Sequence, residues 1–543
     1  MCSLLQSFNT LPWRSAHSES LAFVAVLAWW WGAAYRKAIV RVRWNLPILI
    51  LFCASLLIGI QFVTRKIEFG GDAVILLIYV FLCIATLLVA QWHDDDRNWP
   101  ATLAAALLVT ALISVFISLV QALGVWTESD WIVHYPEYRR PGANLGQPNL
   151  LGTLLVMGAA SLIYLDQRLR ISRLVTVLLS FFLMLGMGIT ESRTGLLSGI
   201  ILCVWWLGRG RVFLRAPRRS WVATSALALI AMMLTWPPLI SAIQEAGPLR
   251  DMVTINTNSS GRLEVWRQLW DAILMKPWFG WGLRGISAAL NTVAENYPKS
   301  SPFTYAHNII LDLAVDTGLP LTVLVLCVAI PLLWRQVDNV RTTESWYSVG
   351  LLIPFGIHSL FEYPFAYSYF LVPAMLSIGM LSRGDGCGIK VAISRNIIFG
   401  FIIVSGFILI RVGVEYIDLE DDFRIARFEA LNIGRTPENY DRPSIILLTQ
   451  LEAMTAATRV LPRPNMPREE IDLLRRVTLR FPWVPIQNSY ALSLALNGDT
   501  QEATRQLRVM LAMHGRKVYE ERKVKWMELS NIMYPQLRIV VLP

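Results

Sequence analysis

Twelve long apolar stretches constrain this chain more than any other feature of its sequence. They lie at about 21–35, 45–63, 73–92, 101–125, 149–165, 174–190, 195–208, 221–241, 306–334, 346–360, 367–382 and 396–414. A helix needs about 20 apolar residues to cross a bilayer, and most of these stretches reach or approach that length. The pattern predicts an all-α polytopic membrane protein with about 12 transmembrane helices. The stretches at 21–35, 195–208 and 346–360 are short, so one or two of them could be re-entrant.

The formal charge of +10 reflects topology rather than a nucleic-acid partner, because the basic residues lie in short loops between the apolar stretches. Alternate loops differ strongly in their content of Lys and Arg, and cytoplasmic loops carry the excess. The poor set holds only Arg65, Lys66, Arg139, Arg140 and Arg193. This bias predicts that loops 126–148 and 242–305, the turns at 191–194 and 361–366, and the C-terminal tail lie on the outer side of the membrane. The same count places the N-terminus on the outer side; if the first helix is wrongly assigned, only that end is reversed.

The tail, about 415–543, is predicted to be a soluble α-helical domain, separate from a transmembrane domain at 1–414. Residues 490–507 have the pattern of two amphipathic helices joined at Asn497-Gly498-Asp499, similar to a tetratricopeptide-type hairpin. Only one such unit is plain, so we expect a small helical domain that presents a partner. The six Cys are dispersed and lack metal-ligand spacing, which favours small core residues over a metal site.

The stretch Tyr305–Leu321 places His307 and Asn308 at the head of a long apolar run. An ionisable ring at the membrane boundary is costly to place there, so we interpret it as a functional group. The alternative is that His307 caps the helix or belongs to an interfacial belt. Two other motifs put polar groups at expected helix junctions on the same side. Gln147 and Asn149 enter one helix, whereas His358 and Glu362 lie four residues apart and could satisfy each other.

Two arginines on the predicted outer side are candidates for binding phosphate. Arg193 lies in the short connection Thr190–Gly195, and its planar guanidinium offers a fork of donors that suits phosphate. A local pair with Glu191 is the alternative. Arg262 opens a helix, whose free N-terminal amides favour anions.

The segment 261–285 is predicted to contain an amphipathic helix along the outer membrane face, because Val265, Leu269 and Ile273 recur at helical spacing. Arg284, near its end, is a further possible substrate-binding cation. The segment also carries four tryptophans that could be sugar platforms, although interfacial anchors are the simpler interpretation. They are Trp266, Trp270, Trp278 and Trp281.

Together these motifs resemble the O-antigen ligase and polymerase superfamily of bacterial inner membranes, over about residues 140–370. The matching features are Ser192-Arg-Thr-Gly195, the Gly261-Arg262 helix with its Pro277-x-x-Gly280-x-Gly282 ending, and His307-Asn308 followed by Gly318. Within the superfamily, Gln147-Pro-Asn149, the segment His358–Pro364 and the long tail look most like the protein O-oligosaccharyltransferases of the PglL type. Leu321 departs from the ligase pattern, which has Gly, Thr or Tyr there, and this weakens the lipid A ligase interpretation.

The resemblance implies a GT-C-like fold and transfer of a preassembled glycan from an undecaprenyl-pyrophosphate carrier to a hydroxyl on the periplasmic side. The acceptor would be a Ser or Thr of an exported protein such as a pilin, and the displacement would be direct and inverting. No cofactor or metal is expected, because arginines can stabilise the pyrophosphate leaving group. His307 would be the general base, and Arg193 and Arg262 would bind the pyrophosphate. Further possible substrate contacts are Gln147, Asn149, Arg284, Asn308, His358, Glu362, Trp266 and Trp281.

Three other functions compete with this interpretation. A repeat-unit polymerase, or a ligase to lipid A-core, would share the mechanism and differ in its acceptor. A lipid-linked sugar flippase would instead need arginines facing a cavity at mid-bilayer, whereas these polar groups gather at one face. A structural membrane protein would explain the helices but not the Arg and His residues at their ends.

Overall fold

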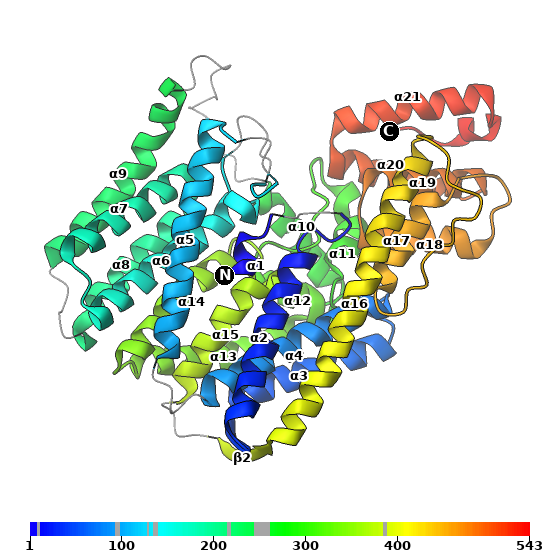
Figure 1. Ribbon diagram of the computed structural model, residues 1–543. Helices are drawn as coiled ribbons and strands as arrows, with labels where there is room; N and C mark the ends of the chain where they lie inside the picture. The colour runs from blue at the N-terminus through cyan, green and yellow to red at the C-terminus, as the bar shows by residue number, and fades with distance from the viewer. Residues whose placement is uncertain are drawn as a thin grey trace. The chain divides into compact units, whose positions relative to one another are not determined.

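The structure is a computed structural model that describes residues 1–7, 11–92, 98–126, 130–133, 140–213, 219–243, 261–383 and 388–543 (Figure 1). Arg139, Cys387 and part of the 242–305 loop therefore lie outside the described residues. The chain forms two compact units. The first consists of Met1–Cys53, Tyr79–Ile255 and Ala329–Phe407, and the second of Ala54–Ile78, Asn256–Val328 and Ile408–Pro543.

Helices make up nearly all of the regular structure. In chain order they are α1 (Cys2–Leu5), α2 (Ala16–Arg36), α3 (Leu46–Val63), α4 (Gly70–Trp92), α5 (Trp99–Leu123), α6 (Pro148–Leu169), α7 (Arg173–Thr190), α8 (Arg193–Arg209), α9 (Arg219–Ile243), α10 (Arg262–Met275), α11 (Ile286–Val293), α12 (Ile309–Thr317), α13 (Leu319–Asp338), α14 (Thr343–Ser359), α15 (Ser368–Arg383), α16 (Arg395–Ala430), α17 (Thr449–Arg459), α18 (Arg468–Arg480), α19 (Val484–Leu496), α20 (Thr500–His514) and α21 (Arg516–Ile532). The two strands are β1 (Ile39–Trp44) and β2 (Ile389–Ser394).

Each of the twelve predicted apolar stretches lies on helix. Within the described ranges, nine helices are long and apolar enough to cross a membrane by length and composition, namely α3 to α9, α13 and α16. The protein is therefore a multi-pass, largely α-helical membrane protein. The other three predicted spans are α2, which is less apolar, and α14 and α15, which have 17 and 16 residues. The predicted stretch 306–334 is two helices, because α12 ends at Gly318, which has a φ of 86°, and α13 starts directly after it.

The first unit is built around α6, which packs against α5, α7, α8 and α14. In the apolar span of α6, 83% of the residues are buried, against 33% in α7, so α6 is surrounded by protein rather than lipid. Small residues allow this close packing. A Cβ on Gly158 would lie 2.6 Å from the Cβ of Ala111 on α5. The N-terminus of this central helix carries the polar motif that begins at Gln147.

One element departs from the all-α prediction. Strands β1 and β2 pair antiparallel, in a register that runs from Ile39 opposite Ser394 to Trp44 opposite Ile389. Val40 and Val42 are buried on one face of β1, whereas Arg41 on the other face is exposed. Residues 39–44 lie between two predicted apolar stretches and would form a basic loop by the charge bias, but their alternation of apolar and charged residues is that of a half-buried strand.

The second unit contains α10, α11, α12 and the helices α17 to α21 of the tail. Val265, Leu269 and Ile273 of α10 are buried in a shared core with residues of α11, α12 and α20. The predicted helix is thus present, but the apolar face on which the prediction was based packs on protein. That the helix lies along the membrane stays a prediction.

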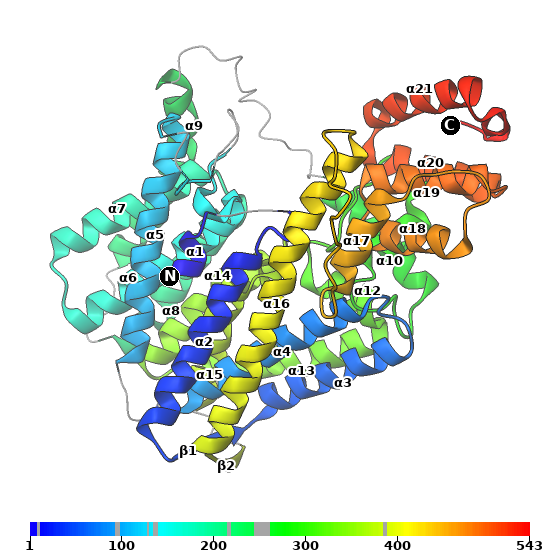
Figure 2. The same cartoon turned by 45° about the vertical axis from the view of Figure 1, so that its right-hand side comes forward.

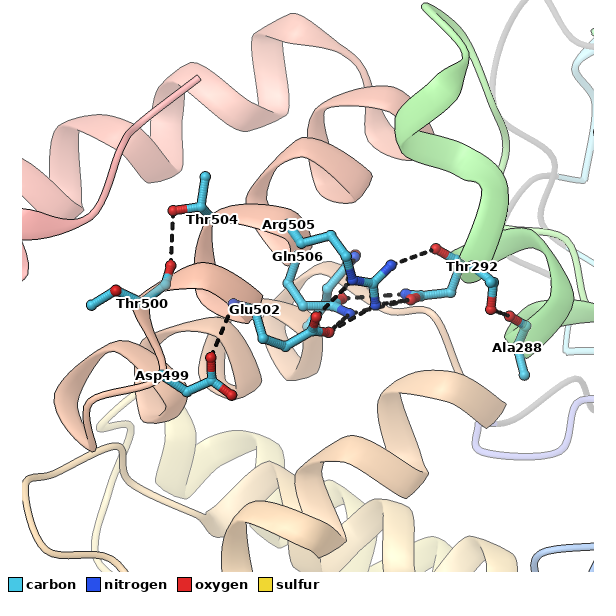
Figure 3. Close-up of polar contacts among 10 residues, drawn as sticks. Ala288, Thr292, Asp499, Thr500, Glu502, Thr504, Arg505 and Gln506 are labelled. Atoms are coloured by element: carbon cyan, nitrogen blue, oxygen red, sulfur yellow. Dashed lines mark hydrogen bonds and ion pairs between the residues drawn. The ribbon is translucent and has the colours of Figure 1, made fainter.

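Polar contacts join α11 to α20 in the same unit (Figure 3). The guanidinium of Arg505 donates to the backbone and side-chain oxygens of Asn291, both at 3.1 Å, and it pairs with Glu502 at 2.7 Å. Asp499 accepts a hydrogen bond from the backbone N–H of Glu502 and so caps α20. The predicted connection at residues 497–499 therefore lies between the two helices α19 and α20.

Helix α16 is a single element of 36 residues, drawn in yellow in Figure 2, that continues past residue 414. Glu415 is 1% exposed and accepts hydrogen bonds from the backbone N–H groups of Ile446, Leu447 and Leu448. Its other partner is Arg411, at 3.0 Å. A buried carboxylate with this many donors is well satisfied. Its hydrogen bonds hold residues 446–448, which lead into α17, against α16.

Candidate functional site

Three helix ends of the first unit bring polar motifs together around Glu362. The carboxylate of Glu362 accepts hydrogen bonds from the amide nitrogens of Gln147, at 2.5 Å, and Asn149, at 2.6 Å. His358 Nε2 lies 3.2 Å from the same carboxylate. Glu362 is only 3% exposed, so these donors replace water around the charge. Four residues predicted from separate motifs therefore form one cluster, which we call the Glu362 cluster.

His358 is the fully buried member of this cluster. Its Nδ1 lies 2.7 Å from the hydroxyl of Thr153 on α6. Because an ionised carboxylate only accepts, Nε2 carries the proton shared with Glu362, and Nδ1 of a neutral ring then accepts from Thr153. Both nitrogens are satisfied by protein, which fits a residue that holds the cluster together rather than one that accepts a proton from substrate.

The Ser192–Gly195 motif joins this cluster through its serine. The Ser192 hydroxyl donates to the side-chain oxygen of Asn149 at 2.7 Å and accepts from the backbone N–H of Gly195 at 3.1 Å, so it caps α8. A Cβ on Gly195 would lie 3.2 Å from the Cα of Gly152, which shows how closely α8 approaches α6. Arg193 is exposed at the first position of α8, where its charge adds to the positive end of the helix dipole.

In the second unit, the glycines of the Pro277-x-x-Gly280-x-Gly282 motif meet Gly318 at the end of α12. A Cβ on Gly280 would lie 2.4 Å from the carbonyl oxygen of Val315, and a Cβ on Gly318 would lie 2.6 Å from the backbone of Trp278. Both glycines also have positive φ angles. The backbone of Trp281 donates to Val315 at 2.7 Å and completes the contact. These glycines therefore lock the end of α10 to the helix that begins after His307.

His307 lies in a tight turn formed by Tyr305–Asn308, with a left-handed φ of 58°. Its Nδ1 is 3.1 Å from the carbonyl oxygen of Tyr305, and its ring packs on Phe303 with centroids 4.2 Å apart. Since a carbonyl can only accept, the neutral ring carries its proton on Nδ1, and its lone pair is on Nε2. Asn308 caps α12 by accepting from Ile310 and Leu311. The alternative that His307 caps the helix is therefore wrong, because Asn308 does so.

A buried carboxylate holds this turn from behind. Asp312 of α12 accepts a hydrogen bond from the backbone N–H of Ala306 at 2.8 Å. Burial raises the pKa of Asp312 to about 7, although the Ala306 hydrogen bond and the charge of Arg284 act in the opposite direction. Burial, and then the neighbouring Asp312, raise the pKa of Asp316 well above its ordinary value. Arg284 donates to the Tyr305 hydroxyl, so the cation, the two carboxyl groups and the His307 turn are parts of one assembly.

Two of the four tryptophans support this assembly from inside the unit. The indole N–H of Trp266 donates to the carbonyl of Ala306, and that of Trp281 donates to the carbonyl of Ala272, both at 2.8 Å. Arg262 is one helical turn before Trp266, so both residues lie on the same side of α10. Trp270 and Trp278 are exposed instead, at 48% and 71%. The described His, Cys, Asp and Glu residues form no group of three or more that could hold a metal ion.

Comparison with known proteins supports the resemblance that the motifs indicate. Residues 176–326 match the family model described as O-antigen ligase, and residues 346–528 match that of the virulence factor membrane-bound polymerase C-terminal region. A general O-oligosaccharyltransferase of Acinetobacter baylyi is 24% identical over 525 residues, which cover 93% of this chain and 89% of that protein. These matches support a place for the chain in the O-antigen ligase and polymerase superfamily. The predicted resemblance is thereby confirmed.

A second relative from the same organism is a ComP-specific O-oligosaccharyltransferase, 27% identical over 357 residues, 64% of this chain and 63% of that protein. The two superfamily matches divide the motifs between them. The O-antigen ligase match contains Arg193, Arg262 and His307, and the polymerase match contains His358 and Glu362. Arg193 and the Glu362 cluster belong to the first unit of the structure, whereas Arg262, Arg284, His307 and Asn308 belong to the second.

Sequence reasoning overlooked Thr153, Tyr305, Asp312 and Asp316 as parts of these sites. The two aspartates left a signal, because they lie four residues apart in a run interpreted as membrane-spanning, where a carboxylate is costly. Thr153 left none, since a threonine in an apolar helix is common and its partner is distant in sequence.

Proposed function

We propose that this chain is a PglL-type protein O-oligosaccharyltransferase of the bacterial inner membrane, with its active site on the periplasmic face. It transfers a preassembled glycan from an undecaprenyl-pyrophosphate carrier to a Ser or Thr hydroxyl of an exported protein, such as a pilin. The observation that carries the proposal is the hydrogen bond between His307 Nδ1 and the Tyr305 carbonyl. Two relatives named O-oligosaccharyltransferases support the reaction class.

His307 acts as the general base in this reaction. With the proton on Nδ1, the Nε2 lone pair takes the proton of the acceptor hydroxyl as its oxygen attacks the anomeric carbon of the glycan. The new glycosidic bond forms as the bond from the anomeric carbon to the pyrophosphate oxygen breaks, and the pyrophosphate leaves with the electron pair. Attack from the side opposite the leaving group inverts the anomeric centre.

Arg262 and Arg193 bind the pyrophosphate and stabilise the charge that develops on it. Charge-assisted contacts from guanidinium to phosphate are formed in the ground state and strengthen as the leaving group departs. Arg262 fits this role because it opens α10 one turn before Trp266, which is bound to the residue preceding His307. The arginines can supply this electrostatic stabilisation in place of a metal ion.

Asp312 is a positioning residue for His307. It does not touch substrate in this scheme, but its hydrogen bond to Ala306 fixes the turn from which the imidazole projects. A base must lie within hydrogen-bonding distance of the proton it removes, so a loosened turn lowers the rate even when the ring is intact. In the Glu362 cluster, the half-buried Gln147 and Asn149 are the members that can reach a substrate hydroxyl, whereas Glu362 and His358 are buried and hold them in place.

The acceptor is tested by co-expression with a lipid-linked glycan pathway, one exported pilin and a lipopolysaccharide core. We expect a mass increase on a Ser or Thr of the pilin, and loss of that increase in His307→Ala. A match to the O-antigen ligase model keeps transfer to lipid A-core as the second candidate. Glycan on the lipopolysaccharide core and none on any exported protein would establish that candidate instead.

A further inference from the structure

An apolar stripe also runs along the side of α10 that faces away from the protein core, beside the exposed Arg267 and Asp271. Leu263, Trp270 and Leu274 recur along it at helical spacing, and each is about half exposed. Met275, the last residue of the helix, and Trp278 and Phe279 in the turn that follows extend this surface, and they are 59%, 71% and 76% exposed. We call these six residues the α10 apolar surface. Because α10 already buries a separate apolar face in the unit's core, this second one needs another environment.

The position of this surface relative to the membrane follows from two apolar helices, α3 and α13, whose ends contact the turn at 277–280. The Lys66 ammonium, three residues after α3 ends, donates to the carbonyl of Phe279 at 2.7 Å. Leu319, the first residue of α13, donates its backbone N–H to the carbonyl of Pro277 at 2.7 Å. Both α3 and α13 are apolar enough to cross a membrane. The turn at 277–280 therefore lies at the level where two membrane-spanning helices end, which is the headgroup layer.

The charges beside the surface complement that layer. Lys66 lies with its ammonium 5.2 Å from the Phe279 ring, and Lys276 with its ammonium 3.9 Å from the Trp281 ring. Burial and the charge of Lys276 both lower the pKa of Lys66, so the two cations are close enough to repel each other. Exposed Trp and Phe side by side with lysines are the usual composition of a protein surface at the membrane–water boundary.

We infer that the α10 apolar surface docks on the outer leaflet of the bilayer, with Trp278 and Phe279 inserted among the lipid headgroups and Lys66 and Lys276 facing lipid phosphates. The inference concerns the second unit alone and does not depend on the transferase activity. Its consequence is that α10 lies flat on the membrane with its core-facing side turned toward the protein. A lipid-borne substrate would then reach this unit within the plane of the headgroups.

The inference is tested with the full-length protein in nanodiscs of phosphatidylcholine and phosphatidylglycerol. A cysteine is introduced as Phe279→Cys in a background without the native cysteines, and it is labelled with bimane. Lys517→Cys is the matched control, because Lys517 is exposed on α21 of the same unit, a helix that contributes nothing to the apolar surface. Lipids carrying a nitroxide near the headgroup should quench the label at 279 several-fold more than the label at 517. Aqueous iodide should show the reverse order.

Two results would overturn the inference. The first is equal lipid quenching at the two positions together with strong iodide quenching at 279, which would place the surface in water. The second is shielding of residue 279 that appears only when a lipid-linked glycan is added, which would make Trp278 and Phe279 a sugar platform. A thermal unfolding curve unchanged from the parent excludes misfolding as the cause, since Phe279 is 76% exposed.

Discussion

Replacing Asp312 by Leu should slow glycan transfer while leaving donor binding intact. Leu keeps the branching of Asp at Cγ but has no hydrogen-bond acceptor, so it leaves the N–H of Ala306 without an acceptor in a site where Ala306 is 0% exposed. An unsatisfied buried donor costs about 1–3 kcal/mol. Each 1.4 kcal/mol is a factor of about ten, so the productive turn should be about 5- to 150-fold less populated. The expected result is a kcat lower by that factor and an unchanged KM for the lipid-linked donor.

Asp312→Asn is the matched control, because an amide keeps an oxygen that can accept from Ala306. The pKa of Asp312 is raised to about 7, so the native group is already partly protonated near neutral pH, and the neutral amide should retain most of the activity. Single-turnover transfer by purified protein in nanodiscs separates the chemical step from binding. The reasoning is refuted if the Leu variant, folded with an unchanged unfolding temperature, turns over normally, or if the Asn variant loses as much activity as the Leu variant.

Three further perturbations test other parts of the structure. Arg262→Ala should weaken both donor binding and turnover, and Arg262→Lys should restore only part of either, because a point charge lacks the bidentate fork; a full rescue by Lys, measured by donor titration, would argue against a guanidinium–phosphate contact. Glu362→Gln should lower the unfolding temperature, because the new NH2 group would face an amide NH2 that now donates to the carboxylate, at a cost of about 1–3 kcal/mol. An unchanged melting curve would contradict the buried cluster. His514, whose pKa is lowered to about 4 by burial, stays neutral in the folded tail while the unfolded chain binds a proton near pH 6.5. Its contribution to stability should be complete above pH 6.5 and be lost as the pH falls toward 4, by less than about 3 kcal/mol; thermal unfolding of His514→Gln from pH 7.5 to 4.5 should show a flatter profile, and an identical pH dependence would contradict it.

The apolar stretches predicted the helices well because length and hydropathy are local properties of the sequence. The sequence Gly318-Leu319-Pro320 also contains a signal for the end of one helix and the beginning of the next. The surrounding apolar residues are continuous, however, so the two helices look like one stretch. The sequence did not reveal the strand pair, because Ile39–Trp44 pairs with Ile389–Ser394 near the other end of the membrane region, and no local signal identifies so distant a partner. The alternating pattern by itself favours a strand, but the cations within it also fit a cytoplasmic loop, and the charge bias favoured the loop.

The polar motifs were found individually, whereas their grouping was not. Glu362 and His358 were predicted to satisfy each other, yet Glu362 also accepts from Gln147 and Asn149, more than 200 residues earlier in the chain. Sequence spacing within one helix predicts the i, i+4 pair, but contacts between helices depend on packing around α6. Asp312 was overlooked for a related reason, because its role lies in a hydrogen bond to the backbone, which no side-chain motif reveals.

The central claim is that His307 removes the proton of the acceptor hydroxyl through Nε2. Its most direct test is the single-turnover rate of His307→Ala with saturating lipid-linked donor and acceptor protein, measured with and without added imidazole. Removal of a positioned base typically costs about 10²–10⁴-fold in rate. We predict a loss in that range with donor affinity unchanged, and partial recovery by imidazole in its neutral form as the pH rises. A well-folded His307→Ala protein that transfers glycan at a near-normal rate would contradict the account.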